Sequence, residues 1–381
     1  MQTLIFGGAF DPPHNEHVNM VRAAVAELGI SRVVIVPTYL PPHKSAGYLD
    51  FDERVELCRV AFCDCGAEVV IDDTERQRGK DNYASLLLPV FKEKYGDIVY
   101  LIGGDSLQYL YDWRNPRDIM ATCPIAVAGR EGYRNVEETK REVEEKFGGQ
   151  IILLNYCGKD VSSGRIKARL FMGEMPEEIP AEVAEIIKNR NLFGKYGQIV
   201  GKVAEFEDEE LFAHTRAAVL RAVDLNSAHN LKQDFDKVFL AALLHDNAKQ
   251  RPSLDGLNVP SDSVGTPVLH QFLGAEKAKR DFGVTDNDIL NAIRYHTTAK
   301  PDMTVLEKLI YTADSTSYDR EYDPIPELRR IVDENFENGF YVLLKWTYDK
   351  IIAKGKGIYP LTAEAMHYYQ NKREEAQKEY K

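Results

Sequence analysis

Two patterns of apolar residues divide this chain. In the first half, short runs that are apolar throughout alternate with stretches in which apolar residues recur every three or four positions. Continuous apolar runs are typical of strands buried on both faces, and the longer period is typical of helices. Strands are predicted over residues 3–6, 32–38, 67–73, 97–104, 124–130 and 150–155, and helices over 17–28, 51–62, 83–95 and 136–147.

Strands that alternate with helices predict a parallel sheet, because parallel neighbours need a crossover connection, usually a helix. Right-handed crossovers then give an α/β, Rossmann-like, doubly wound parallel sheet. Ligands of such sheets bind outside the carboxyl ends of the strands. The segment GGAFDPPHNEH, residues 7–17, follows the first strand and is therefore expected at a ligand site.

The second half has helical periodicity and almost no strand pattern. The change falls in the glycine-containing stretch NRNLFGKYGQIVGKV, which predicts a joint between two domains. We expect these domains over residues 1–195 and 200–381, the second one all-α. Its helices are predicted over 208–228, 234–249, 268–282, 286–296, 305–315 and 326–354.

Composition narrows the class of protein. The chain has 381 residues, of which 44% are hydrophobic and 28% charged, which fits two globular domains. It has no apolar run near the ~18 residues of a membrane helix, no signal-peptide pattern, and five cysteines at unrelated spacings. We therefore expect a cytoplasmic protein. The net charge of −12 argues against nucleic-acid or membrane-surface binding but allows small phosphorylated ligands.

The segment after the first strand is suited to an anion. The Gly7-Gly8 turn lets the backbone approach a ligand closely. The following helix directs its N–H groups and positive dipole end at the same place. His14 and His17, three residues apart, share one helical face and can both donate hydrogen bonds to a phosphate. The alternative is a helix N-terminus with two surface histidines.

The same segment resembles the G-G-T-F-D-P-x-H-x-G-H signature of the bacterial nicotinate-mononucleotide adenylyltransferases, within the nucleotidylyltransferase superfamily. Further segments resemble that family in order: VPTYLPPHK, FDERVELCRVAF, LIGGDSLQYLYDW, AVAGR and VSSGRIKARL. The resemblance implies that AMP is transferred from ATP to nicotinate mononucleotide, giving deamido-NAD and pyrophosphate. It also implies that Mg²⁺ enters with ATP.

The resemblance assigns roles to single residues. It implies that His14 and His17 bind the ATP phosphates and stabilise the transition state, and that Lys44 neutralises the triphosphate. Trp113 would stack on the nicotinate ring, with Asp105 nearby. The other expected ATP- or substrate-binding residues are Gly7, Gly8, Phe10, Arg54, Gly103, Arg130, Ser162 and Ser163, with Arg165 and Lys167 as weaker candidates.

The chain departs from the signature at several positions. Ala9, Ala84 and Gly164 replace threonines, and Glu16 replaces the glycine between the two histidines. A carboxylate at Glu16 would repel a triphosphate unless it points away or is paired. These departures leave open a first half that only senses nucleotides. Nicotinamide mononucleotide also stays open as the acceptor, whereas the GGDS…W stretch argues against phosphopantetheine.

The second half has a candidate metal site on separate predicted helices. In VFLAALLHD, two adjacent polar side chains would be buried without partners, and a bound cation would remove that cost. Histidine with aspartate suits iron, manganese or zinc, and such a metal can promote phosphoester hydrolysis. Each histidine taken alone is more simply a hydrogen-bonded core residue. The candidate residues are His214, His245, Asp246, His270, His296 and Asp314.

The order H…HD…H…H…D resembles the HD-domain phosphohydrolases. LLHDNAK, LHQFLGA, AIRYHTTAK and LEKLIYTAD resemble the branch that cleaves diadenosine tetraphosphate to two ADP. The resemblance implies that His214, His245, Asp246 and Asp314 hold iron, or manganese or zinc, and that Asp246 is catalytic. His270 and His296 would serve substrate phosphates or a second metal. Lys249 and Thr297 are expected to bind substrate, and Arg320 is a weaker candidate.

The sequence therefore predicts a bifunctional enzyme of adenylyl nucleotides. A different substrate for the HD half, such as a nucleoside monophosphate or guanosine tetraphosphate, stays open. The oligomeric state stays open as well, a homodimer included.

Overall fold

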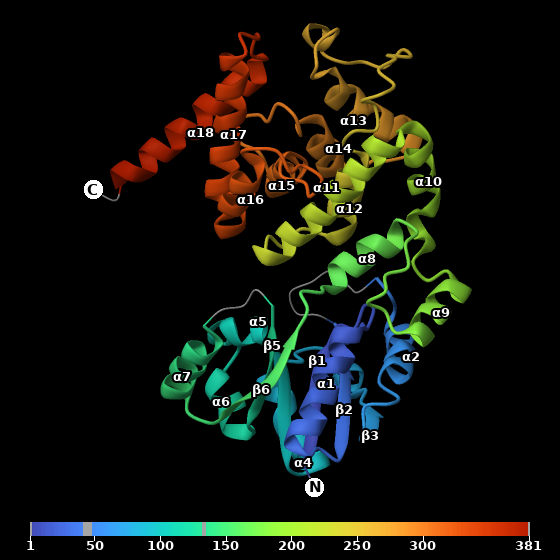
Figure 1. The fold of residues 1–381 in the computed structure, drawn as a ribbon, viewed down its shortest axis with the longest axis vertical. Coiled ribbons are helices and arrows are strands. Elements are labelled where there is room, and N and C mark those ends of the chain that lie inside the picture. The colour runs from blue at the N-terminus through green and yellow to red at the C-terminus, as the bar shows by residue number, and fades with distance from the viewer. Residues whose placement is uncertain (1, 41–47, 132–134, 380–381) are drawn as a thin grey trace. The chain divides into compact units, whose positions relative to one another are not determined.

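The structure is a computed structural model of the chain, and it describes residues 2–40, 48–131 and 135–379 (Figure 1). The chain divides into two compact units. Unit 1 consists of Met1–Lys167 and Met175–Phe193, and unit 2 of Ala168–Glu174 and Gly194–Lys381. The short segment Ala168–Glu174 thus belongs to unit 2, although it precedes the last part of unit 1 in sequence.

Unit 1 is built on a six-stranded parallel sheet with the strand order β3-β2-β1-β4-β5-β6, which confirms the predicted doubly wound sheet. The central strands are apolar and buried because helices cover both faces. The order changes direction between β1 and β4, where such sheets bind ligands. The strands are β1 (Thr3–Gly8), β2 (Arg32–Pro37), β3 (Glu68–Ile71), β4 (Ile98–Gly103), β5 (Ile125–Arg130) and β6 (Ile151–Gly158).

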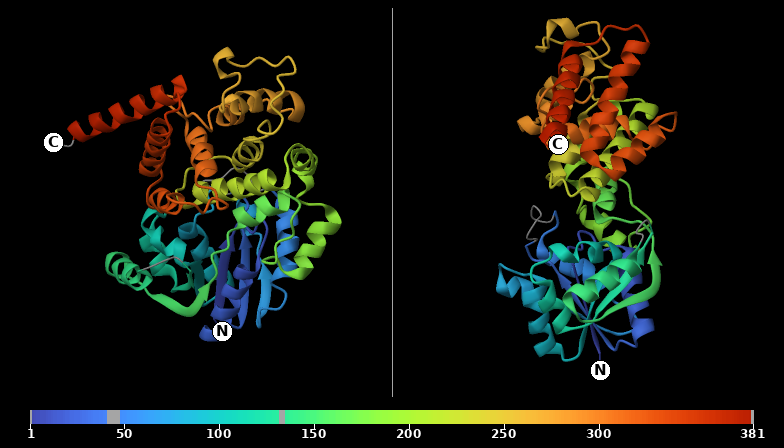
Figure 2. Two further views of the ribbon diagram at one scale, coloured as in Figure 1. Left: turned by 45° about the horizontal axis from the view of Figure 1, so that its top comes forward. Right: turned by 90° about the vertical axis from the view of Figure 1, so that its left-hand side faces the viewer.

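Helices cover both faces of this sheet (Figure 2). Apolar residues of α4, α6 and α7 pack with Ile5 and Val34 on one face. Helices α1 and α2 lie against the strands on the other face, which Leu4 and Phe6 share because side chains alternate along a strand. The helices of unit 1 are α1 (Asn15–Leu28), α2 (Phe51–Ala61), α3 (Thr74–Arg78), α4 (Ala84–Tyr95), α5 (Gly104–Gln108), η1 (Leu110–Asp112), α6 (Pro116–Thr122), α7 (Val136–Phe147), α8 (Ser163–Phe171, whose last residues lie in unit 2) and α9 (Ala181–Arg190).

Residues 194–379 contain helices and no strand, as the sequence predicts. Helices α11, α12, α14 and α15 pack on one another around an apolar core. At the start of unit 2, the ring of Phe171 contacts the rings of Tyr196, Phe235 and Phe239. The helices are η2 (Gly194–Tyr196), α10 (Gly197–Phe206), α11 (Glu209–Ala228), α12 (Phe235–Leu244), η3 (Ser261–Ser263), α13 (Leu269–Phe282), α14 (Asn287–Arg294), α15 (Val305–Ser315), α16 (Ile325–Glu334), α17 (Phe336–Ala353) and α18 (Pro360–Glu379).

The predicted helix over 326–354 is wrong, because the structure has two helices there. Asn335 has an extended backbone, with φ −156°, and its side chain accepts a hydrogen bond from Asn338 N at 2.9 Å. It therefore ends α16 and caps α17. Two other helices stop earlier than predicted, α12 at Leu244 and α14 at Arg294. None of the helices described is both long and apolar enough to cross a bilayer.

The crossing of α16 and α17 depends on Gly339. A Cβ atom there would collide with the backbone of Val332. We expect Gly339→Ala to shift backbone at this crossing and to lower the free energy of unfolding by about 2 kcal/mol. A lower urea midpoint, followed by circular dichroism at 222 nm, would show this.

Gly201→Ala is the matched control, because a Cβ in α10 meets nothing within 4 Å. That change removes a helical glycine and should stabilise the chain by roughly 1 kcal/mol. Equal midpoints for both variants would contradict the close crossing.

Candidate functional site

The turn after β1 is closed by an aromatic cluster. Phe10 has φ +48° and a side chain that is 1% exposed. Its ring packs against Phe6, Phe62 and His17, with centroids 5.1–5.6 Å apart. A Cβ at Gly8 would lie only 3.0 Å from the Phe10 ring. A glycine at the end of β1 is therefore required by this ring, and Phe10 supports His17 from the core.

His14 and His17 stack at the start of α1. Their ring centroids are 3.5 Å apart and their planes meet at 19°. The backbone N–H of His14 donates to His17 Nδ1 at 3.2 Å, so the proton of a neutral His17 ring is on Nε2. Burial lowers the pKa of both imidazoles, that of His17 to about 3, and Arg130 adds to the effect. Both rings are therefore neutral hydrogen-bonding groups at pH 7.

His14 has a polar atom that suits a ligand. Its Nδ1 is buried and has no hydrogen-bond partner in the part of the chain that the structure describes. A buried polar atom without a partner costs free energy. A bound phosphate at the N-terminus of α1 would give it one.

Arg54 holds the backbone around this turn. Its side chain is 3% exposed. It donates to the carbonyl oxygens of Ala9 and Thr38, both at 2.8 Å, and to that of Leu49 at 3.3 Å. The sequence assigned Arg54 to the nucleotides, but in the structure its hydrogen bonds go to the loops that surround the site.

Asp11 joins the turn to two other segments. Its carboxylate accepts hydrogen bonds from Tyr48 N at 2.9 Å and Leu49 N at 3.1 Å. It also forms an ion pair with Lys167 Nζ at 2.7 Å. Lys167, a weaker candidate for the triphosphate, is thus engaged by this carboxylate. Lys44, predicted to neutralise the triphosphate, lies outside the described residues.

Glu16 is bonded at the end of β6. Its Oε2 accepts hydrogen bonds from the Tyr156 hydroxyl at 2.5 Å and from Lys159 N at 3.1 Å. A Cβ at Gly158 would collide with that oxygen, so the glycine makes room for it. The Glu16 carboxylate was expected to repel a triphosphate unless it points away or is paired. In the structure it accepts hydrogen bonds from two donors at the edge of the sheet.

The carboxyl ends of β4 and β5 bring Asp105 and Arg130 together. Arg130 Nη1 is 3.5 Å from Asp105 Oδ2, and its Nη2 bonds Asp160 Oδ1 at 2.7 Å and the Val161 carbonyl at 2.9 Å. A Cβ at Gly103 would lie 2.5 Å from Asp105 Oδ1. Gly103 therefore makes room for the carboxylate rather than for a ligand.

The remaining predicted residues of unit 1 are Ser162, Ser163 and Trp113. Ser162 precedes α8, and its Oγ accepts a hydrogen bond from Arg165 N at 3.1 Å. Ser163 is the first residue of that helix. Trp113 is half-buried, with its ring 6.3 Å from that of Tyr100.

A cavity of about 180 Å³ adjoins Gly7 and Gly8, and sequence reasoning missed it. The prediction of a turn at these glycines is wrong, because they are the last two residues of β1 and pair with Val36 and Pro37. The polar lining of the cavity includes Glu75 and Asn82. Burial raises the pKa of the Glu75 carboxyl to about 7, although the N–H of Tyr39 and the Arg54 charge oppose the shift. Glu75 lies in the short helix α3 and Asn82 in the loop that follows it. Neither segment has apolar periodicity, so no periodic pattern marked these two residues.

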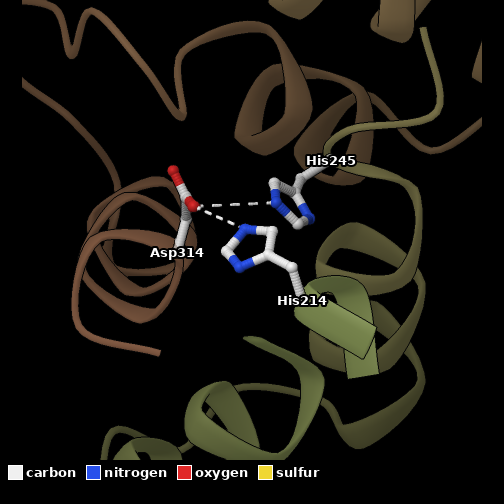
Figure 3. A group of neighbouring side chains, drawn as sticks. All are labelled: His214, His245 and Asp314. Carbon is white, nitrogen blue, oxygen red and sulfur yellow. Dashed lines mark hydrogen bonds and ion pairs between the residues drawn. The ribbon is translucent and has the colours of Figure 1, made fainter. Parts of the chain in front are cut away.

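In unit 2, three predicted ligands meet from two helices and the turn that follows a third (Figure 3). His214 comes from α11, His245 directly follows α12, and Asp314 comes from α15. Asp314 Oδ1 lies 3.0 Å from His214 Nε2 and 3.8 Å from His245 Nε2. These ligand atoms all lie within 4.8 Å of one another, which fits a bound cation.

Asp246 lies between this group and two further histidines. Its side chain is fully buried. Oδ2 faces His245 Nε2 at 3.3 Å and His214 Nε2 at 3.8 Å. Oδ1 faces His270 Nε2 at 3.4 Å and His296 Nε2 at 3.5 Å. The structure thus brings all six candidate metal-site residues together.

Main-chain carbonyls orient three of these histidines. Nδ1 of His245 donates to Ala242 O at 2.7 Å, and Nδ1 of His296 to Ile293 O at 2.7 Å. His270 makes the same bond to the carbonyl three residues earlier, at 2.8 Å. Because a carbonyl only accepts, Nδ1 of each ring carries a proton in these bonds, and Nε2 of each ring faces Asp246.

This centre attracts positive charge. Burial would raise the pKa of Asp246, but the imidazoles of His245 and His296 hold it well below its usual range. Burial lowers the pKa of His214, but hydrogen bonds to Asp314 and Asp319 raise it by more than burial lowers it. The pKa of His214 therefore rises to about 9. Asp246 Oδ1 and His245 Nε2 have no hydrogen-bond partner among the described residues. The donor set therefore fits a divalent metal ion.

Two predicted substrate residues border the centre. Lys249 Nζ bonds Asp246 Oδ2 at 2.6 Å, and the Thr297 hydroxyl lies 3.0 Å from His270 Nε2. The adjacent His-Asp pair was expected on a helix, which is wrong. It lies in the turn after α12, and His296 lies in the turn after α14. Turns allow neighbouring side chains to face one centre, which a helix makes difficult.

Comparison with known proteins places both units. The family described as cytidylyltransferase-like matches residues 5–169, and the HD domain family matches residues 211–319. A protein of Clostridium acetobutylicum named probable nicotinate-nucleotide adenylyltransferase is 32% identical over 195 residues, which are 50% of this chain and 97% of that protein. This chain belongs to the nicotinate-nucleotide adenylyltransferase family.

One family relative extends over both units. A protein of Mycoplasma genitalium named probable nicotinate-nucleotide adenylyltransferase/Ap4A hydrolase is 24% identical over 362 residues, covering 91% of this chain and 98% of the relative. A solved HD superfamily hydrolase from Clostridium acetobutylicum, described as involved in NAD metabolism, is 30% identical with a TM-score of 0.44. It covers 47% of this chain and 98% of that one. The match of residues 211–319 to the HD domain family shows that this member of the adenylyltransferase family also carries an HD domain.

The role of Arg54 in this family member can be tested by removing its charge. Arg54→Met leaves three carbonyls near the turn without a charged donor. We expect the free energy of unfolding to fall by about 3 kcal/mol. Urea denaturation measures this, and Arg59→Met, an exposed position on the same helix, is the control. Equal urea midpoints for the two variants would contradict a structural role for Arg54.

Proposed function

We propose that the chain is a bifunctional enzyme. Unit 1 transfers AMP from ATP to nicotinate mononucleotide, and unit 2 hydrolyses diadenosine tetraphosphate to two ADP. The observation that carries the proposal is the assembly of both motif sets on one chain. Its Mycoplasma genitalium relative, matched over 98% of its length, is named for both activities.

In unit 1, the chain supplies neutral donors and a helix N-terminus rather than a nucleophile. A phosphate oxygen of nicotinate mononucleotide attacks the α-phosphorus of ATP, a new P–O bond forms, and the bond to the β-phosphate oxygen breaks. His17 Nε2–H and the N-terminus of α1 would stabilise the charge on the phosphates, and Mg²⁺ carried by ATP would offset the rest. Pyrophosphate leaves with the bonding electrons.

The alternative of a sensing module is not favoured. It was motivated above all by Glu16, and this carboxylate is bonded to Tyr156 and Lys159. The acid form of the acceptor mononucleotide is proposed because the family relatives are named for nicotinate rather than nicotinamide.

In unit 2, His214, His245, Asp246 and Asp314 would hold the metal, for which we propose iron, with manganese or zinc as alternatives. A bound divalent metal would lower the pKa of a water molecule and polarise a phosphate. Lys249, beside Asp246 at the rim of this site, would neutralise substrate phosphate. Asp246 would keep the metal in place with one oxygen.

A second cation between Asp246, His270 and His296 is supported by the hydrogen-bonding roles there. His270 Nε2 and His296 Nε2 are 3.2 Å apart, and both are acceptors because Nδ1 of each ring donates to a carbonyl. Together with Asp246 Oδ1 they form a group of acceptors, which would repel phosphate oxygens and attract a cation.

The two activities should separate by mutation. His17→Ala removes a donor to the ATP phosphates and should lower adenylyl transfer by about 10²–10³-fold, leaving tetraphosphate hydrolysis unchanged. Asp246→Ala removes a ligand at the centre of unit 2 and should abolish hydrolysis while adenylyl transfer continues. The assay uses ATP with nicotinate mononucleotide, then diadenosine tetraphosphate, on the purified chain.

His367→Ala is the matched control, because His367 is exposed on α18. Both rates should stay at the wild-type value. Tetraphosphate hydrolysis that survives in Asp246→Ala would refute the hydrolase half, and transfer that survives in His17→Ala would refute the role of the stacked histidines.

The number of bound metal ions tests the second cation. We expect two divalent ions per wild-type chain and one per His270→Ala/His296→Ala chain, because the first group of ligands is intact there. Elemental analysis of protein loaded with Mn²⁺ and passed through a desalting column measures this. One ion in both proteins would assign the two histidines to phosphate instead.

A further inference from the structure

A short segment after α15 reaches back to the metal centre. It comprises residues 316–320, directly after the ligand Asp314 and the end of the helix at Ser315. Arg329, on α16, donates to three carbonyl oxygens of this segment, those of Thr316 at 3.1 Å, Ser317 at 2.7 Å and Arg320 at 2.9 Å. One guanidinium therefore fixes the path of the whole segment.

A second contact holds the middle of the segment. The Tyr318 hydroxyl donates to Asp224 Oδ2, on α11, at 2.5 Å. The central guanidinium carbons of Arg221 and Arg329 lie 5.7 Å and 5.6 Å from the centre of the Tyr318 ring. The segment is thus tied to both α11 and α16, and its side chains have defined positions.

Two side chains of the segment meet the candidate ligands. Asp319 Oδ2 lies 2.9 Å from His214 Nδ1, and Arg320 Nη2 lies 2.6 Å from Asp314 Oδ1. The Ser317 hydroxyl is a weaker neighbour, 3.4 Å from His214 Nδ1. Asp319 belongs to no motif of the sequence and stands in a loop, so periodicity could not single it out.

His214 needs this partner because of its place in a helix. His245 and His296 follow the last residue of their helices, and His270 is the second residue of its own, so carbonyls near them are free of helical bonds. His214 lies inside the 20-residue helix α11, where the preceding carbonyls already accept backbone N–H groups. Its Nδ1 can be satisfied only from another element.

We propose that Asp319 is a positioning residue that orients His214 toward the metal. The carboxylate accepts the Nδ1 proton, which leaves the lone pair on Nε2 and fixes the angle of the ring. It also makes Nε2 a stronger donor to a cation, as carboxylates behind metal-bound histidines do. This inference rests on the metal centre proposed for unit 2.

The test compares metal affinity in full-length chains. Metal-free wild type, Asp319→Asn and Asp319→Glu are titrated with Mn²⁺ against a chelator of known affinity. Asparagine keeps the size of the side chain but loses the charge, so we expect the affinity to fall about 10–100-fold. Asp319→Glu keeps a carboxylate and should recover part of the loss. Thermal unfolding of the metal-free proteins should show that each variant is still folded, since the segment stays tied by Arg329.

Asp224→Asn is the matched control, because Asp224 contacts the same segment through Tyr318 and does not touch His214. Its affinity for Mn²⁺ should equal that of wild type. Equal affinity in wild type and Asp319→Asn, or an equal loss in Asp224→Asn, would overturn the role of Asp319. Absence of Mn²⁺ binding by wild type would instead overturn the metal centre itself, and with it the proposed hydrolase.

Discussion

The burial of one carboxylate governs the arrangement of unit 2. Asp246 has no solvent-exposed side-chain surface, and its two oxygens face different pairs of imidazole nitrogens. An isolated charge in such a place would be prohibitive. It is tolerated because the helices supply counter-charge or ligand atoms from four directions. The turns after α12 and α14 place His245 and His296 so that their ring nitrogens face this carboxylate.

Unit 1 meets a different constraint, because its candidate phosphate site is formed largely by backbone. The turn after β1 has little regular hydrogen bonding of its own, so distant groups must hold it. Arg54 donates hydrogen bonds to carbonyl oxygens at this turn, and Asp11 joins the turn to the segment after residue 47. The buried Phe10 ring fills the space beneath the turn. Several residues that the family signature contains therefore act on the shape of the loop, and only His14 and His17 present ring nitrogens to a ligand.

Much of this could be predicted from the sequence, for physical reasons. Strands buried on both faces leave long apolar runs, and the order of strands and helices then fixes a parallel sheet. The six metal-site residues were predicted because an adjacent His-Asp pair in an apolar run, together with histidines and an aspartate on other predicted helices, resembles an HD motif. Periodicity could not predict where a helix ends. Asn335 breaks the last long helix through its own side chain, and α12 stops one residue before His245 within an unbroken apolar pattern.

Partners across long sequence distances were also beyond the sequence. Glu16 looked incompatible with a triphosphate, and the hydroxyl that holds it is 140 residues away. Asp319 lies 105 residues from the ring that it contacts. Neither pairing leaves a local signal, because each depends on how separate elements fold together.

The division of α8 has a practical consequence for anyone who dissects this protein. Ser163–Lys167 counts with unit 1, but Ala168–Glu174 counts with unit 2, where Phe171 fills a site among Tyr196, Phe235 and Phe239. A fragment that starts at the glycine-rich joint near residue 195 would lack that aromatic side chain and expose the apolar surface beneath it. The two units therefore cannot be separated by cutting the chain at a single peptide bond.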